Sequence, residues 1–313
     1  MLSATPICIP GHEVQRSSPL QHTLRHADVL VDGMRIHWAE LGASSDHVPL
    51  LLLHGLMDSH LTWKRVAPLL ARDRRVLMPD LLGCGLSARP DASYALDWHA
   101  RMMAGFLAAL GLDRVDVAGH SYGGGVAQVM LLERPHPIRR LLLVASGGLG
   151  RDVGFWLKFG TFPHFVERYG QPFMAFGTRR AVGGKRETSS KQDVSALAAM
   201  NAKRGTARAF SRTVRDVIDW RGQKRLFHHR AHEVEALPPI AVFWGGEDDL
   251  IPAAHGHALV EAADHVVLRI FDGCGHYLHQ EQPELFAQAT LSFLDDPNVQ
   301  HAHLRRRAPP GSP

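Results

Sequence analysis

Residues 114–133 constrain the fold more than any other stretch of this sequence. They read RVDVAGHSYGGGVAQVMLLE: a short apolar strand, a serine framed by glycines, and an apolar helix. Within them, residues 119–123 (GHSYG) match the G-x-S-x-G pattern, whose serine turns sharply from strand to helix between two positions that must lack side chains. A bare match arises often by chance, but here the strand and the helix stand where the pattern requires them. We therefore predict a strained turn at Ser121 and consider this residue a candidate nucleophile.

The composition is that of an ordinary globular protein with an uneven charge. The chain has 313 residues, of which 45% are hydrophobic and 21% charged, and single α/β domains commonly reach this size. Its formal net charge is +4, yet residues 151–235 hold 17 Lys and Arg against 8 Asp and Glu. No nucleic-acid motif accompanies this excess, so we expect a solvated basic face rather than a surface for anionic membranes or carboxylate substrates.

The cysteines and the N-terminus bear on the compartment. Cys8, Cys84 and Cys274 lie far apart, and their odd number argues against a disulfide framework or a zinc ribbon. The N-terminus has no charged segment followed by a long apolar run, and no apolar stretch reaches 18 residues. We expect a soluble, cytoplasmic protein without integral membrane association.

The remaining pattern predicts alternating strands and helices. Asp32-Gly33 is a typical hairpin turn between apolar residues 27–31 and 34–41, so the chain should open with two antiparallel strands. After residue 49, uniformly apolar strands indicate a sheet covered by helices on both faces. Further strands are expected at 50–55, 75–81, 115–118, 139–145, 239–246 and 265–273, and helices at 62–71, 96–110, 126–132, 255–263 and 283–294.

Residues 147–237 interrupt this alternation. They read as helical, and eight of the chain's 23 aromatic residues fall within 155–176. An insertion after a sheet strand would lie over the carboxyl ends of the strands, where α/β sheets bind ligands, so we interpret this segment as a helical cap. Its aromatic residues either form the cap's own core or line an apolar pocket. The other expected divisions are a flexible lead-in at 1–20, a core at 21–146 and 238–297, and a flexible tail at 298–313.

Two polar residues after later strands complete a catalytic arrangement. A serine becomes nucleophilic when a histidine removes its proton, and that histidine needs an acid to orient it. Asp248 follows one apolar strand within WGGEDDLIP, and His276 follows the next within FDGCGHYLH. The order serine, acid, histidine is the one expected with a nucleophile elbow. Asp249 is the alternative acid, but Asp248 follows its strand more closely.

An acyl-transfer site also needs two backbone N–H donors for the developing oxyanion. Tyr122, directly after the serine, should supply one. The other should come from the loop HGLM at 54–57, where we choose Leu56 with Met57 as the alternative.

Other polar residues have plainer interpretations. His54 and Asp80 should fix loops by hydrogen bonds, and His279 should be solvated. His228 and His232 are spaced like a metal pair on a helix, but no acid completes an H-E-x-x-H pattern, so we expect solvent exposure.

Five segments of the chain resemble the α/β-hydrolase superfamily over residues 25–296. They are LLLLHGLMDS, MPDLLGCGLSARP, VAGHSYGGG, WGGEDDLIP and GCGHYLHQEQPE, in the family's order. The resemblance implies a mostly parallel eight-stranded sheet with helices on both faces and a helical cap. It also implies Ser121 as nucleophile, Asp248 as acid and His276 as base, with the amides of Leu56 and Tyr122 as oxyanion hole.

The reaction depends on the subfamily. Dehalogenases and epoxide hydrolases of this cap type use an aspartate nucleophile, which Ser121 argues against. The meta-cleavage-product C–C hydrolases are similar throughout the core but carry Asn before the serine and Trp after the histidine, where this chain has His120 and Tyr277. We therefore expect a carboxylic-ester hydrolase that forms an acyl-enzyme, with C–C hydrolysis of a diketone or a non-catalytic binding protein as alternatives.

The expected ligand is a small apolar acyl or aromatic molecule, with no metal, organic cofactor or nucleic acid. Candidate substrate contacts are Met57, His120, Phe159 and Tyr277. The sequence does not determine the oligomeric state.

Overall fold

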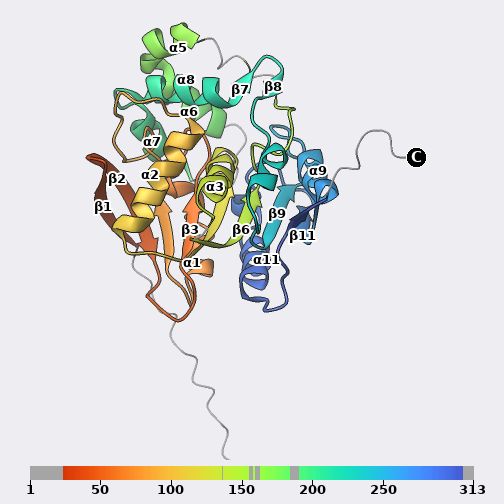
Figure 1. Ribbon diagram of the computed structural model, residues 1–313. Helices are drawn as coiled ribbons and strands as arrows, with labels where there is room; N and C mark the ends of the chain where they lie inside the picture. The colour runs from red at the N-terminus through yellow and green to blue at the C-terminus, as the bar shows by residue number, and fades with distance from the viewer. Residues whose placement is uncertain (1–23, 136, 155–157, 159–162, 184–189, 306–313) are drawn as a thin grey trace, which may run out of the picture.

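An eight-stranded sheet forms the centre of the molecule (Figure 1). The structure is a computed structural model that describes residues 24–135, 137–154, 158, 163–183 and 190–305. The strand order is β1-β2-β4-β3-β5-β6-β9-β11. β2 runs antiparallel to β1 and β4, and all other neighbours are parallel, which confirms the predicted sheet. The strands are β1 (Arg25–Val31), β2 (Met34–Leu41), β3 (Leu50–Leu53), β4 (Val76–Pro79), β5 (Val115–His120), β6 (Ile138–Val144), β9 (Ile240–Gly245) and β11 (Val266–Phe271).

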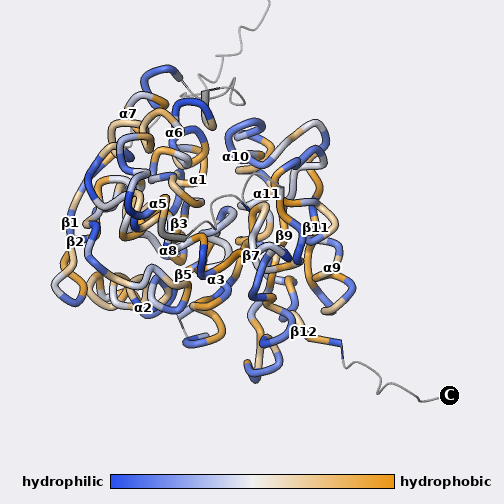
Figure 2. Tube along the Cα trace, turned by 90° about the horizontal axis from the view of Figure 1, so that it is seen from above, coloured by the Kyte–Doolittle hydropathy of each residue, from blue (hydrophilic) through white to orange (hydrophobic). Residues whose placement is uncertain are grey.

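Helices cover both faces of the sheet. Every residue of β3, β4, β5 and β9 is buried, as expected for parallel strands packed on two sides. Seen from above, α2 and α3 lie on one side and α1 and α11 on the other (Figure 2). The core helices are α1 (Ala67–Leu70), α2 (Leu96–Ala109), α3 (Tyr122–Glu133), α9 (Ala254–Ala262), α10 (Leu278–Glu281) and α11 (Pro283–Asp295).

The helix expected at 62–71 forms as two short turns. A 3-10 turn η1 (His60–Trp63) precedes α1, and Pro68 lies in the first turn of α1. Proline fits that position, but in a helix interior it removes a hydrogen bond and clashes with the preceding turn. The single long helix was therefore wrong.

The segment 147–237, here called the inserted segment, lies between β6 and β9, and its helices at 163–183 and 191–217 gather at one end of the sheet (Figure 1). Most of its described part is helical. Its elements are α5 (Pro163–Tyr169), η2 (Gln171–Phe173), α6 (Met174–Gly183), α7 (Lys191–Asn201), α8 (Thr206–Val217), β7 (Ile218–Asp219), β8 (Gly222–Gln223), η3 (Phe227–His229) and η4 (Ala231–Glu233).

Ion pairs join the basic inserted segment to the core. On α8, Arg208 and Arg212 both contact Asp91, at 3.3 and 2.6 Å. Arg225, after β8, contacts Asp97 of α2 at 2.8 Å. Part of the basic excess is therefore paired with core carboxylates at the surface, and the solvated basic face stays a prediction.

The chain after α11 also packs against the core. β12 (His303–Leu304) pairs with β10 (Ala263–Asp264), and Ala302 is buried. The expected flexible tail thus does not begin at 298. Within the described residues, no helix is long and apolar enough to cross a membrane.

Candidate active site

Ser121 occupies a strained turn between β5 and α3. Its backbone angles are φ 53° and ψ −116°, a conformation that residues other than glycine rarely adopt. A Cβ on Gly119 would lie 2.6 Å from Gly124 Cα, and one on Gly123 would collide with the Leu53 carbonyl oxygen. Gly119 therefore lets β5 approach α3 around the serine, and Gly123 lets α3 approach the end of β3.

His276 and Asp248 form a buried pair. His276 Nδ1 lies 2.8 Å from Asp248 Oδ2, and the backbone amides of Leu250 and Ile251 each donate to Asp248 Oδ1 at 2.9 Å. Asp249 is exposed. Because the carboxylate can only accept, Nδ1 carries the proton in this pair and Nε2 is left as the basic nitrogen.

The loops that carry this pair are locked together. The Glu247 amide donates to the Cys274 carbonyl oxygen at 2.9 Å, and Gly245 has no room for a Cβ because the carbonyl oxygens of Gly275 and Cys274 occupy the space. Glu281, which the sequence interpretation missed, accepts from the amides of Gly275 at 2.7 Å and Tyr277 at 3.2 Å. Its carboxylate therefore holds the loop on both sides of His276.

His120 connects the serine turn to the histidine loop. Its Nε2 lies 2.9 Å from the His276 carbonyl oxygen, and the two rings are 4.8 Å apart between centroids. Among the described residues, no hydrogen bond joins the Ser121 hydroxyl to His276. Catalytic hydrogen bonds are often long without substrate and tighten when it binds.

The loop after β3 lies against the serine. A Cβ built on Gly55 would be 3.3 Å from Ser121 Cβ, which brings the Leu56 backbone close to the nucleophile position. Tyr122 is the first residue of α3, so its amide belongs to the helix-terminal donors that have no partner within the helix. The Leu56 amide therefore stays the predicted second donor, with Met57 as the alternative.

The loop's far side contacts the inserted segment. Met57 has φ 59°, which is strained for a residue with a side chain. Asn201 of α7 donates to the Met57 carbonyl oxygen at 2.9 Å and to Thr178 Oγ1 at 3.1 Å. Nothing in the local sequence pointed to Asn201, because it is separated from Met57 by 144 positions.

A family model for the alpha/beta hydrolase fold matches residues 48–283. The chain belongs to the α/β-hydrolase family.

Of three similar proteins, one is uncharacterised and two are named as hydrolases. An uncharacterised protein of Mycobacterium tuberculosis is 32% identical over 256 residues, covering 79% of this chain and 75% of that one. The 2-hydroxymuconate semialdehyde hydrolase of Pseudomonas sp. strain CF600 is 29% identical over 277 residues, covering 85% and 93%. A solved structure of a serine hydrolase involved in carbazole degradation matches at 25% identity with a TM-score of 0.69, covering 87% and 99%.

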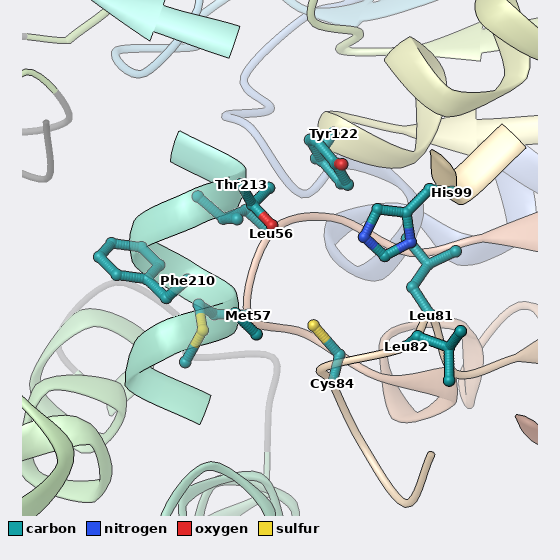
Figure 3. A pocket seen from close by; sticks show the side chains of 10 residues that line it. Leu56, Met57, Leu81, Leu82, Cys84, His99, Tyr122, Phe210 and Thr213 are labelled. Carbon is teal, nitrogen blue, oxygen red and sulfur yellow. The ribbon is translucent and has the colours of Figure 1, made fainter. Parts of the chain in front are cut away.

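In this α/β-hydrolase, a pocket lies beside the candidate oxyanion loop. It lies among that loop, the loop after β4, α2 and α8 (Figure 3). Most of its lining is apolar, while Cys84, His99, Tyr122 and Thr213 add polar atoms. The lining residues are Leu56, Met57, Leu81, Leu82, Cys84, His99, Tyr122, Ala209, Phe210 and Thr213.

His99 is the unexpected polar residue of this pocket. Its ring points toward the space between Thr213 and Cys84 (Figure 3). His99 is buried. Its burial, and to a smaller extent the nearby His54, lower the pKa of His99 to about 3. The imidazole is thus neutral at any working pH.

The other expected substrate contacts, His120, Tyr277 and Phe159, differ in their burial and in whether the structure describes them. His120 is fully buried and bonded to His276, whereas Tyr277 is half-buried with its ring 5.0 Å from that of His120. Phe159 lies outside the described residues, as do Phe155, Trp156 and Phe162. The described aromatic residues of the same cluster are exposed, namely Phe165, Tyr169, Phe173 and Phe176, so they form no core within the inserted segment.

His279 corrects a further expectation. It is fully buried rather than solvated, with its Nε2 3.0 Å from Thr62 Oγ1 and its ring 4.5 Å from that of Trp63. It lies in α10, whose inner side faces η1. His54 and Asp80 do fix loops: the Leu81 amide donates to His54, and the amides of His60 and Leu86 donate to Asp80.

Proposed function

We propose that this protein is a serine hydrolase that cleaves carboxylic esters through an acyl-enzyme. The observation that carries the proposal is the combination of Ser121 on a strained elbow with the buried His276–Asp248 pair at 2.8 Å. A serine, a histidine and an acid in these roles are sufficient for acyl transfer. No step in this reaction requires a metal or an organic cofactor.

In the proposed reaction, Ser121 Oγ attacks the ester carbonyl carbon while His276 Nε2 takes its proton. Asp248 stabilises the imidazolium that forms. The amides of Leu56 and Tyr122 donate to the tetrahedral oxyanion, and removal of one such donor typically costs about 10²–10³ in kcat. His276 returns the proton to the leaving alcohol, and a water molecule activated by the same histidine then hydrolyses the acyl-enzyme.

We place the acyl group, the substrate's acid portion, beside Leu56 and Tyr122, where the pocket is narrow and would have to widen to admit it. The pocket's described lining is mostly apolar and contains no Lys or Arg, and His99 is neutral because burial lowers its pKa to about 3. A carboxylate held there would lack a cation to compensate its desolvation. Met57 is the proposed acyl contact in this pocket, and Tyr277, which does not line it, is a proposed contact elsewhere. Phe159 stays a proposed contact from the sequence alone. The inserted segment is proposed to act as the cap.

A second candidate is hydrolysis of a carbon–carbon bond in a ring-cleavage diketone. Its support is the similarity to the 2-hydroxymuconate semialdehyde hydrolase over 93% of that protein's length. The same triad would serve both reactions. The absence of a basic residue among the described pocket residues and the replacement of asparagine by His120 favour the ester.

Two measurements test the proposal. A fluorophosphonate should label wild-type protein at Ser121, and Ser121→Ala should abolish both labelling and activity. Failure of the folded wild type to label would instead support a binding protein. Hydrolysis of p-nitrophenyl acyl esters should exceed cleavage of a 2-hydroxymuconate-type diketone in kcat/KM, and the opposite order would select the C–C reaction.

A further inference from the structure

Three histidines and an aspartate gather where the first strands of the sheet meet two loops. His26 lies on β1, His37 on β2, His60 begins η1 and Asp80 directly follows β4; these four are called the His–Asp cluster. His37, His60 and Asp80 are all buried, and one potential ligand atom from each lies within 4.8 Å of the others. None of the four belongs to the proposed triad or lines the acyl pocket.

The closest contacts in the His–Asp cluster have the spacing of neighbouring ligands on one metal ion. His26 Nδ1 lies 3.1 Å from His37 Nε2, and His60 Nδ1 lies 3.0 Å from Asp80 Oδ1. Tetrahedral zinc with Zn–N bonds of about 2.0–2.1 Å separates its ligand atoms by about 3.3 Å. His37, His60 and Asp80 already offer ligand atoms within 4.8 Å of one another, and the exposed His26, which contacts His37, would have to turn toward the ion to complete the set.

The surroundings hold these ligands in suitable orientations. Asp28 Oδ1 lies 2.9 Å from His37 Nδ1, so that carboxylate directs His37 Nε2 toward the cluster, as carboxylates commonly do for metal-binding histidines. Arg35 also donates to Asp28, which suits Asp28 to orienting His37 rather than to binding the ion. Asp80 is fixed by the amides of His60 and Leu86, each at 2.7 Å.

We propose that the His–Asp cluster binds one Zn²⁺, with His26, His37, His60 and Asp80 as its four ligands. Three imidazole nitrogens and one carboxylate oxygen form a donor set that suits zinc, and calcium or magnesium would require more oxygen ligands. Because the protein fills all four positions, the ion is structural rather than catalytic.

The ion would stabilise an exposed edge of the fold. β1 is an edge strand of the sheet, with β2 as its one neighbour among the described strands, and most of its residues are exposed. Zinc would tie β1 and β2 to η1 and to the loop after β4. A metal ion that binds the folded state but not the unfolded state raises the free energy of unfolding.

The experiment titrates the full-length, chelator-treated protein with Zn²⁺ in a calorimeter and follows the thermal unfolding midpoint. Co²⁺ absorption reports the coordination geometry. We expect one equivalent of Zn²⁺ per chain, a higher unfolding midpoint and a tetrahedral Co²⁺ spectrum. His37→Gln should weaken Zn²⁺ binding at least 100-fold, and Asp28→Asn, which loses only the orienting carboxylate, about 10-fold.

Two further variants make the result decisive. His26→Gln changes an exposed side chain, so this variant should fold normally and still weaken Zn²⁺ binding at least 10-fold. It tests the proposed site if His37→Gln does not fold. His257→Gln, at an exposed position on α9, is the matched control and should bind like wild type. Equal binding by His26→Gln and wild type, or only weak binding at several sites, would overturn the proposal and leave a hydrogen-bonded cluster.

Discussion

His120 Nε2 lies 2.9 Å from the backbone carbonyl oxygen of His276. A carbonyl oxygen only accepts, so this nitrogen carries the proton and His120 donates. The residue before the candidate nucleophile thereby holds the loop of the candidate base, across 156 positions of sequence. His120 is best understood as a positioning residue.

Replacing His120 by phenylalanine should test this relationship. His120→Phe keeps a ring in the buried site but removes the donor, so the His276 carbonyl loses its partner and the loop can shift. Leaving a buried acceptor unpaired costs about 1–3 kcal/mol, and we expect kcat on an acyl ester to fall about 10- to 100-fold with KM little changed. Steady-state kinetics beside His257→Gln as control would measure this. A change confined to KM would mean that His120 contacts the substrate instead.

Phe210 of α8 should set the length of the acyl group. It is one of the residues of α8 that line the pocket, so Phe210→Ala should open space for a longer chain. A methylene accommodated in an apolar pocket is worth about 10-fold or more in specificity. The ratio of kcat/KM for octanoyl over acetyl esters should therefore rise at least about 10-fold. Phe165→Ala, at an exposed position, should leave the ratio unchanged, and equal ratios in both variants would place the acyl group elsewhere.

Much of the fold could be predicted because its determinants are local. The uniformly apolar residues of β3 and β9 indicated a sheet buried on both faces, and Asp32-Gly33 indicated the opening hairpin; both agree with the structure. Gly119 and Gly123 indicated the turn at Ser121 because they stand at fixed offsets from it. Such patterns need no knowledge of distant residues.

The parts of the site that escaped prediction depend on contacts between distant segments. His279 reads as a polar residue near a loop, yet it packs on Trp63, 216 positions away in sequence. Asn201 and the His–Asp cluster likewise draw on elements that only the folded sheet brings together. Residue type indicates that such side chains can form hydrogen bonds, but the partner is set by topology.

Two glycines near the elbow should respond oppositely to alanine. A Cβ at Gly119 would lie 2.6 Å from Gly124 Cα, whereas one at Gly125 would meet Leu96 Cδ2 at an ordinary 3.4 Å. Gly119→Ala should displace the serine, and a misplacement of about 1 Å can cost about 100-fold in rate. Gly125→Ala, within α3, should preserve activity and stabilise the protein by about 0.5–1 kcal/mol. Ester kinetics and urea unfolding would measure both, and an active Gly119→Ala would refute the steric account.

The thiol near the pocket should be inert. Burial raises the pKa of Cys84 to about 12 and that of Cys274 to about 11. A raised thiol pKa means that the protonated form persists up to that pH, so thiolate, the reactive species, is scarce between pH 7 and 9. Treatment with iodoacetamide at pH 8 should leave ester hydrolysis unchanged while free cysteine is alkylated in parallel. Inactivation that rises with a midpoint below pH 9 would contradict this.

Asn201 should couple the inserted segment to the candidate oxyanion loop. It is fully buried, and its side-chain amide donates both to the Met57 carbonyl oxygen and to Thr178 Oγ1. Asn201→Leu removes the donor that supports the strained backbone at Met57. The N–H of the neighbouring Leu56 should then no longer point at the position of the oxyanion. Because an oxyanion donor is typically worth about 10²–10³ in kcat, partial misalignment should lower kcat about 10-fold and slow fluorophosphonate labelling in proportion.

The matched control for this coupling is Thr178→Val. This nearly isosteric change removes the other partner of Asn201 and leaves its bond to Met57 in place, so kcat should stay within about twofold of wild type. Equal losses in Thr178→Val and Asn201→Leu would show that packing of α6 against α7, rather than the bond to Met57, determines the rate. A normal rate in folded Asn201→Leu would show that the loop holds its conformation without the inserted segment.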